Sequence, residues 1–212
     1  MDNLYFDLLP HDLIIELSLY LPLDAIKFYC KTFYTWRSIC ANNTFLQKYI
    51  AYTYNIPMNE VLKIPNKFFI DYINSTNDDM RFHIIIKYDF EPLFEYYLQD
   101  TNYGEELKEK TYKWHNNLVD IMINAIEYRA NNIINYLMKV YKRDFNNMHS
   151  FVIYRIIRHI IEADNIMLLK YFWEELHYAN LLQLYEIHNL IDYAASVNAD
   201  RILEYLEDRY NI

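Results

Sequence analysis

The chain has 212 residues, of which 53% are hydrophobic and 23% charged, and its formal net charge is -9. This balance indicates a globular protein with a substantial core, and it disfavours a nucleic-acid-binding protein, which needs a concentrated basic face. A single glycine, Gly104, excludes the glycine-rich fingerprints that bind phosphates and dinucleotides. Because its apolar runs span only a few residues, the sequence predicts no membrane-spanning segment. We therefore expect an all-α fold with Asn and Asp at left-handed turn positions.

The first predicted element is a short helix between two Leu-Pro pairs, Leu9-Pro10 and Leu21-Pro22. Proline fits the first turn of a helix, because the N–H that it lacks has no partner there. Asp12 suits the positive end of the helix dipole. Pro22 then ends this helix, and Asp24 is placed to cap the next one.

Residues 1–50 resemble an F-box. The positions that match its pattern are Leu9, Pro10, Leu13, Leu17, Leu21, Pro22, Asp24, Ile26 and Trp36. The segment departs from the pattern at Asp12, where Glu is usual, at Thr32-Phe33, where Val-Cys is usual, and at Leu46, where Trp is usual. The resemblance implies docking on the Skp-type adaptor of an SCF ubiquitin ligase. It assigns the binding of that partner to Leu9, Pro10, Leu13, Leu17, Leu21, Pro22 and Ile26.

The alternative interpretation of residues 1–50 is a set of helices that only caps the N-terminal end of a helical repeat array. Three short helices bury too little surface to be stable alone, so this module must lean on a partner, on the rest of the chain, or on both. Residues 51–80, with Pro57, Pro65 and a polar run at 74–79, are predicted to connect this module to the C-terminal part of the chain.

One apolar pattern recurs through residues 81–212. Each copy has an apolar quartet at i, i+1, i+4 and i+5, a turn of about five residues and a second apolar cluster, which predicts a helix–turn–helix unit. The second clusters begin at Leu93, Ile133, Leu168 and Ile202, at intervals of 40, 35 and 34 residues. This near-constant spacing favours stacked helix pairs over an irregular helical bundle. The predicted interior includes Ala125, Ile133, Ile160, Leu168, Ala194 and Ile202.

The period, and the pattern of residues 194–206, resemble a degenerate ankyrin repeat. The Thr-Pro-Leu-His start of that family is missing from every copy, and it stays open whether β-hairpins remain. The usual turn glycine is replaced by Asp89, Arg129, Asp164 and Asn198. We expect left-handed backbone at these four residues, at the greatest cost for Arg129.

An F-box followed by degenerate ankyrin-like repeats is similar to proteins encoded by large DNA viruses of amoebae. The resemblance implies a viral protein that acts in the host cytoplasm and redirects host ubiquitination, with its repeats binding an unknown target protein.

The sequence contains no pattern for catalysis, and we expect no enzyme, no cofactor and no metal. None of the seven histidines lies three or four residues from another, which argues against a zinc site. Cys30 and Cys40 are the only cysteines, too few for a secreted disulfide framework, and this favours a reducing intracellular setting. Two hypotheses remain. One is a substrate-recruiting subunit of a ubiquitin ligase, and the other is a free-standing scaffold or inhibitor whose first helices only cap the repeats.

Overall fold

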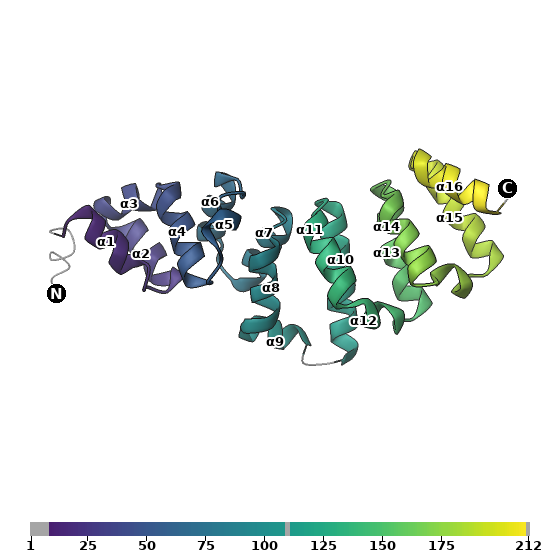
Figure 1. Cartoon of the computed structure of the whole chain (residues 1–212), viewed down its shortest axis with the longest axis horizontal. Coiled ribbons are helices and arrows are strands. Elements are labelled where there is room, and N and C mark those ends of the chain that lie inside the picture. The colour runs from purple at the N-terminus through teal and green to yellow at the C-terminus, as the bar shows by residue number, and fades with distance from the viewer. Residues whose placement is uncertain (1–8, 109–110, 211–212) are drawn as a thin grey trace. The chain divides into compact units, whose positions relative to one another are not determined.

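The computed structural model describes residues 9–108 and 111–210. Every regular element in these two ranges is a helix and none is a strand, which confirms the prediction of an all-α fold (Figure 1). The chain divides into two compact units, Met1–Tyr103 and Gly104–Ile212, which we call unit 1 and unit 2. The predicted boundaries at residues 50 and 80 both fall inside unit 1, and the predicted repeat segment 81–212 is shared between the units.

Four helices of unit 1 begin directly after a proline. They are α1 (His11–Ser18), α2 (Leu23–Thr32), α5 (Met58–Val61) and α6 (Asn66–Asn74), which come after Pro10, Pro22, Pro57 and Pro65. Each proline carbonyl accepts a hydrogen bond from a backbone N–H in the first turn of the helix. The Ile14 N–H, for example, donates to the Pro10 carbonyl with an N···O distance of 3.1 Å. The missing proline N–H lies outside the helical ladder, so these prolines start helices without a lost hydrogen bond.

Asparagine caps two of the remaining helices of unit 1. The remaining helices are α3 (Tyr34–Cys40), α4 (Asn43–Thr53), α7 (Asp78–Lys87) and α8 (Glu91–Asp100), and the two capped by asparagine are α4 and α7. The side-chain oxygen of Asn42 accepts from the Thr44 N–H at 2.9 Å, and that of Asn77 accepts from the Met80 N–H at 2.8 Å. Such caps satisfy N–H groups that a helix cannot pair internally, so the side chains of 42 and 77 mark where α4 and α7 start.

Aromatic side chains fill the interior of unit 1. Seven of them expose 1% of their surface or less: Trp36, Phe45, Phe68, Phe69, Tyr72, Phe90 and Phe94. The hydroxyl of Tyr72 lies 2.7 Å from the hydroxyls of both Tyr54 and Tyr97. Burial raises the pKa of Tyr72 well above its ordinary value. The three hydroxyls therefore satisfy one another as neutral groups within the core.

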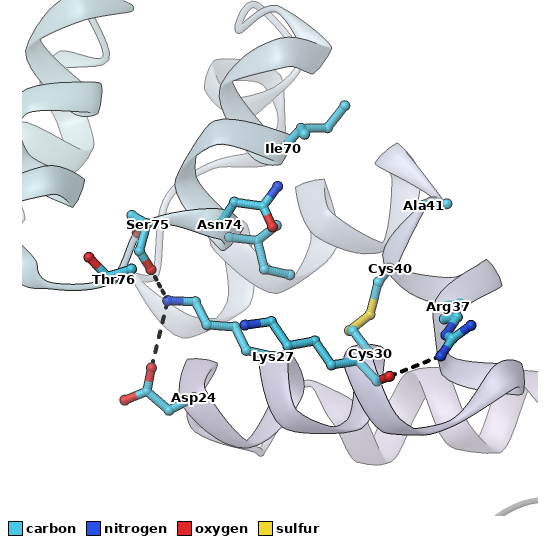
Figure 2. A pocket seen from close by; sticks show the side chains of 12 residues that line it. Asp24, Lys27, Cys30, Arg37, Cys40, Ala41, Ile70, Asn74, Ser75 and Thr76 are labelled. Carbon is cyan, nitrogen blue, oxygen red and sulfur yellow. Dashed lines mark hydrogen bonds and ion pairs between the residues drawn. A yellow bond between two sulfur atoms is a disulfide. The ribbon is translucent and has the colours of Figure 1, made fainter.

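Lys27 ties α2 to the segment after α6. Its ammonium donates a hydrogen bond to the Ser75 carbonyl and lies 3.7 Å from the Asp24 carboxylate (Figure 2). Asp24 also accepts from Arg81 of α7 at 3.1 Å. The N-terminal helices are thus joined to α6 and α7 within unit 1.

Unit 2 consists mainly of helix pairs. After α9 (Asn102–Lys108), its helices are α10 (Thr111–Glu127), α11 (Asn131–Val140), α12 (Lys142–Asn146), α13 (Ser150–Glu162), α14 (Ile166–Lys170), the π-helical turn η2 (Tyr171–Glu175), the short 3-10 helix η3 (Tyr178–Leu181), α15 (Leu184–Ser196) and α16 (Asp200–Tyr210). Helices α10, α13 and α15 contact one another in succession, and α14 contacts α16. All six predicted interior residues are buried, with exposures between 0% and 3%.

The turns between paired helices are left-handed at the four predicted positions. The φ angles are 55° at Asp89, 54° at Arg129, 45° at Asp164 and 57° at Asn198. In each turn, the backbone N–H of the residue after the left-handed one donates to the carbonyl five residues before it. The Ala130 N–H, for example, donates to the Ala125 carbonyl at 2.8 Å. This is the Schellman arrangement, which satisfies the carbonyls at a helix end. The prediction that Asp, Asn and one Arg replace the turn glycine is confirmed.

A fifth turn of the same kind lies in the segment that the sequence predicts only as a connection. Asn55 has φ 51°, and the Ile56 N–H donates to the Ala51 carbonyl at 3.0 Å. Asn55 precedes Asp89 by 34 residues, the repeat interval seen at the end of the chain. The repeat pattern does not predict this turn, because the helix after it, α5, lacks the second apolar cluster found in each predicted copy.

Replacing Ala194 with leucine should overpack the interior of α15, because Ala194 has no exposed surface. We expect Ala194→Leu to lower the free energy of unfolding by about 1–3 kcal/mol in chemical denaturation followed by circular dichroism. The adjacent Ala195, the fourth member of the apolar quartet that begins at Leu190, is exposed, so Ala195→Leu is the matched control. Equal stability of the two variants would show that Ala194 does not face a neighbouring helix.

Replacing Arg129 with glycine should stabilise the turn between α10 and α11. A side chain at a left-handed residue costs about 1 kcal/mol, which the change to glycine would recover. The greater conformational freedom of glycine in the unfolded chain offsets part of this recovery. We expect Arg129→Gly to raise the free energy of unfolding by roughly 0.5 kcal/mol or more. Arg129→Ala keeps the Cβ atom and should give no gain. An alanine variant as stable as the glycine variant would contradict this account of the turn.

Candidate protein-docking site

Helix α1 presents two leucines to solvent. Leu13 and Leu17 lie four residues apart, which places them on one face of the helix, and they are 42% and 41% exposed. Ile14, on another face, has no exposed surface, and the Ser18 hydroxyl, also buried, donates to the Ile14 carbonyl. The buried face packs α1 against the rest of unit 1. The face with Leu13 and Leu17, which we call the leucine face, is not covered by any of the described residues.

The other predicted partner-binding residues divide into accessible and internal ones. Pro10 and Pro22 are exposed, and Leu9 and Leu21 are half-buried. Ile26 has no exposed surface, so in the free chain it supports the module from inside. Tyr49 of α4 fixes the turn between α1 and α2, because its hydroxyl donates to the Leu21 carbonyl at 3.1 Å. Burial raises the pKa of Tyr49 to about 12, so this donor stays protonated.

Exposed aromatic residues extend the apolar surface beyond the positions that the sequence predicts. Tyr20 is 72% exposed and continues the spacing of Leu13 and Leu17. Its ring meets that of Tyr52, on α4, edge to face at 5.2 Å between centroids. The family pattern contains no position for Tyr20 or Tyr52, so only the packing of α4 beside the end of α1 brings them together.

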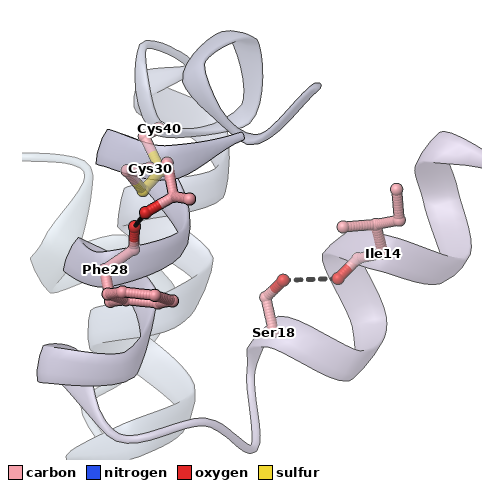
Figure 3. Close-up of a disulfide and its surroundings, with 6 residues drawn as sticks. Ile14, Ser18, Phe28, Cys30 and Cys40 are labelled. Carbon is pink, nitrogen blue, oxygen red and sulfur yellow. Dashed lines mark hydrogen bonds between the residues drawn. A yellow bond between two sulfur atoms is a disulfide. The ribbon is translucent and has the colours of Figure 1, made fainter. Parts of the chain in front are cut away.

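A disulfide joins α2 to α3 in the same module. Cys30 and Cys40 are paired, with their Cα atoms 6.0 Å apart (Figure 3). From the low cysteine count the sequence favours a reducing setting and predicts no disulfide framework, and the structure adds that the two cysteines lie close enough to pair. Counting cysteines does not detect that the tight turn after Thr32 brings α3 back along α2. The Trp36 ring of α3 also stacks on the Tyr29 ring of α2, with 4.8 Å between the ring centroids.

Removing the disulfide should destabilise unit 1. Closing a loop of about ten residues contributes roughly 2–3 kcal/mol in the chain-entropy model. We expect the Cys30→Ala/Cys40→Ala double variant to unfold at lower denaturant concentration than the oxidised wild type. Treatment of the wild type with a dithiol reductant should shift its midpoint in the same direction. An unchanged midpoint after reduction, with free thiols demonstrated by alkylation and mass spectrometry, would contradict a stabilising staple.

Unit 2 contains a groove between the second helices of adjacent pairs. A pocket of about 530 Å³ lies there, lined by residues that include Asn131, Asn135, Met138, Met167 and Tyr171. The Tyr171 hydroxyl donates to the Met138 carbonyl at 3.0 Å and so links α11 to η2. Met167 is 74% exposed at the edge of this groove. Amide and thioether side chains on an open groove are suited to contact with a protein segment.

The described residues contain no group of three or more His, Cys, Asp or Glu side chains placed to hold a metal ion. No helix among them is both long and apolar enough to cross a membrane. His159, beside the apolar quartet of α13, lies 3.1 Å from Glu162 and 3.5 Å from Glu127, as expected of a residue at a helix edge.

Comparisons of the chain with models of protein families, with curated proteins and with solved structures give no match. The functional argument therefore depends on the geometry of the two units.

Proposed function

We propose that this protein is a non-catalytic adaptor that recruits a target protein to an SCF-type ubiquitin ligase. In this proposal residues 1–50 dock on a Skp-type adaptor, and the helix pairs bind the target. The observation that carries the proposal is the leucine face of α1, where Leu13 and Leu17 are exposed on a helix that is anchored through another face by Ile14.

The physical basis is the cost of leaving apolar surface in water. Scattered apolar residues are normal on any protein, but here two leucines share one face of a short helix next to exposed Tyr20. An amphipathic helix of this kind is buried by laying its apolar face in a groove of a partner. Pro10 fixes the start of α1, and the helix is already formed in the free chain, so little conformational freedom is lost on binding.

The target is proposed to bind the groove between α11 and α14, where Met138, Met167 and Tyr171 lie beside amide side chains. The proposed location is the cytoplasm, and the host cytoplasm if the protein is viral. Cys30 and Cys40 would be maintained as thiols there, so the disulfide would form only on oxidation.

Leu13→Asp tests the docking of α1. Because Leu13 is partly exposed, the substitution should leave the fold intact, while in a complex it would bury an unpaired carboxylate. We expect affinity for a eukaryotic Skp adaptor to fall at least roughly thirtyfold, the equivalent of about 2 kcal/mol. The measurement is a titration of wild type and variant by calorimetry.

Leu62→Asp is the matched control, since Leu62 is 59% exposed in unit 1 but lies outside α1. Its affinity for the adaptor should equal that of wild type. If the wild type binds no adaptor and Leu13→Asp instead lowers the melting temperature, α1 is a cap and the scaffold hypothesis is the better one.

A further inference from the structure

Unit 1 contains a pocket that is positively charged in a chain of net charge -9. It has a volume of about 590 Å³ and lies between α2, α3 and α6 (Figure 2). Its charged lining consists of three cations, Lys27, Lys31 and Arg37, and one carboxylate, Asp24. Positive charge is therefore concentrated at one place on a protein that carries an excess of negative charge.

The single carboxylate does not neutralise these cations. Asp24 is 83% exposed, lies 3.7 Å from Lys27, and is shared with Arg81 at 3.1 Å. Among the described residues neither Lys31 nor Arg37 forms an ion pair, and the one hydrogen bond of the Arg37 guanidinium goes to the Lys31 carbonyl at 3.1 Å. Most of the five donors of that guanidinium remain available for an anion.

Lys27 is the most buried cation of the pocket, and it lies close to other cations. Burial lowers the pKa of its ammonium below the ordinary value, and the charges of Arg81 and Lys31 lower it further, against the opposing effect of Asp24. The side chain is only 15% exposed and is held by the Ser75 carbonyl. A bound anion would relieve this repulsion between cations, which is a source of affinity.

The rest of the pocket indicates which anion fits. Ile70, Ile73 and Ala41 form apolar wall, while Asn74 and Thr76 add polar groups beside Lys27. Three cations in one pocket match a single dianionic group, since Arg and Lys both bind phosphate through charge-assisted hydrogen bonds. A nucleic-acid backbone or a membrane surface requires cations spread over a larger face. The apolar wall, in turn, suits a side chain next to the phosphate.

We propose that this pocket binds a phosphorylated serine or threonine of a partner protein, with the phosphate on Lys31 and Arg37 and a neighbouring apolar residue against Ile70. The site lies on unit 1, apart from the leucine face of α1, and the inference does not rest on docking to a Skp adaptor. The disulfide between Cys30 and Cys40 also lines the pocket and joins its α2 and α3 walls.

The test uses the full oxidised chain and two kinds of probe. Acetyl-phosphoserine-amide, added in calorimetry, probes the anion site independently of peptide sequence. A degenerate library of phosphoserine peptides and the same library with serine are then passed over the immobilised protein, and retained peptides are counted by mass spectrometry. We expect saturable binding of the phosphoserine derivative, and at least tenfold retention of phosphorylated over unphosphorylated peptides, with apolar residues enriched beside the phosphate.

The variants are Lys31→Gln/Arg37→Gln and, as matched control, Lys48→Gln/Lys67→Gln, which removes two cations of unit 1 that do not line the pocket. The first pair should lower affinity for the phosphoserine derivative at least tenfold, and the control pair less than twofold. Equal losses in both pairs would mean attraction by net charge alone and overturn the proposal. Equal retention of both libraries, or binding of anionic phospholipid vesicles without binding of phosphopeptides, would overturn it as well.

Discussion

The structure depends on a way of ending helices in a chain that has almost no glycine. At each turn between paired helices, one residue adopts the left-handed conformation so that the next N–H can close the end of the first helix. Asn and Asp tolerate this backbone, and Arg129 adopts it at a cost that the packing around Ala125 and Ala130 compensates. The same turn at Asn55 shows that this way of ending a helix also occurs outside the predicted repeats.

Short helices joined in this way cannot be stable one by one. The burial of residues such as Ile160 and Leu168 requires that each pair pack on its neighbours, as α10, α13 and α15 do in succession. The first helices of unit 1 are held together by aromatic packing, by the hydrogen bonds that Tyr49 and Lys27 donate to backbone carbonyls, and by the disulfide. Among the described residues, this packing leaves the leucine face of α1 and a positively charged pocket uncovered. These two surfaces are the basis of both proposals.

Much of this architecture could be predicted from the sequence because it depends on local rules. Apolar spacing identified the buried face of each helix pair, and the resemblance to the ankyrin repeat indicated Asp89, Arg129, Asp164 and Asn198 as the residues at the left-handed turn position. Interactions between distant segments could not be predicted in this way. The pairing of Cys30 with Cys40, the contact of Tyr20 with Tyr52, and the gathering of Lys27, Lys31 and Arg37 beside α6 all depend on how helices pack. The pattern also aligned Ala195 with buried residues, although in α15 it faces solvent.

The most direct test of the central claim is the mass of the particle formed when this chain is co-expressed with a Skp-type adaptor. Size-exclusion chromatography with multi-angle light scattering would measure it. Docking through α1 predicts a single peak in which both chains are present in a one-to-one ratio, at the sum of their masses. Elution of this protein at about its own 26.1 kDa, with the adaptor in a separate peak, would contradict the account.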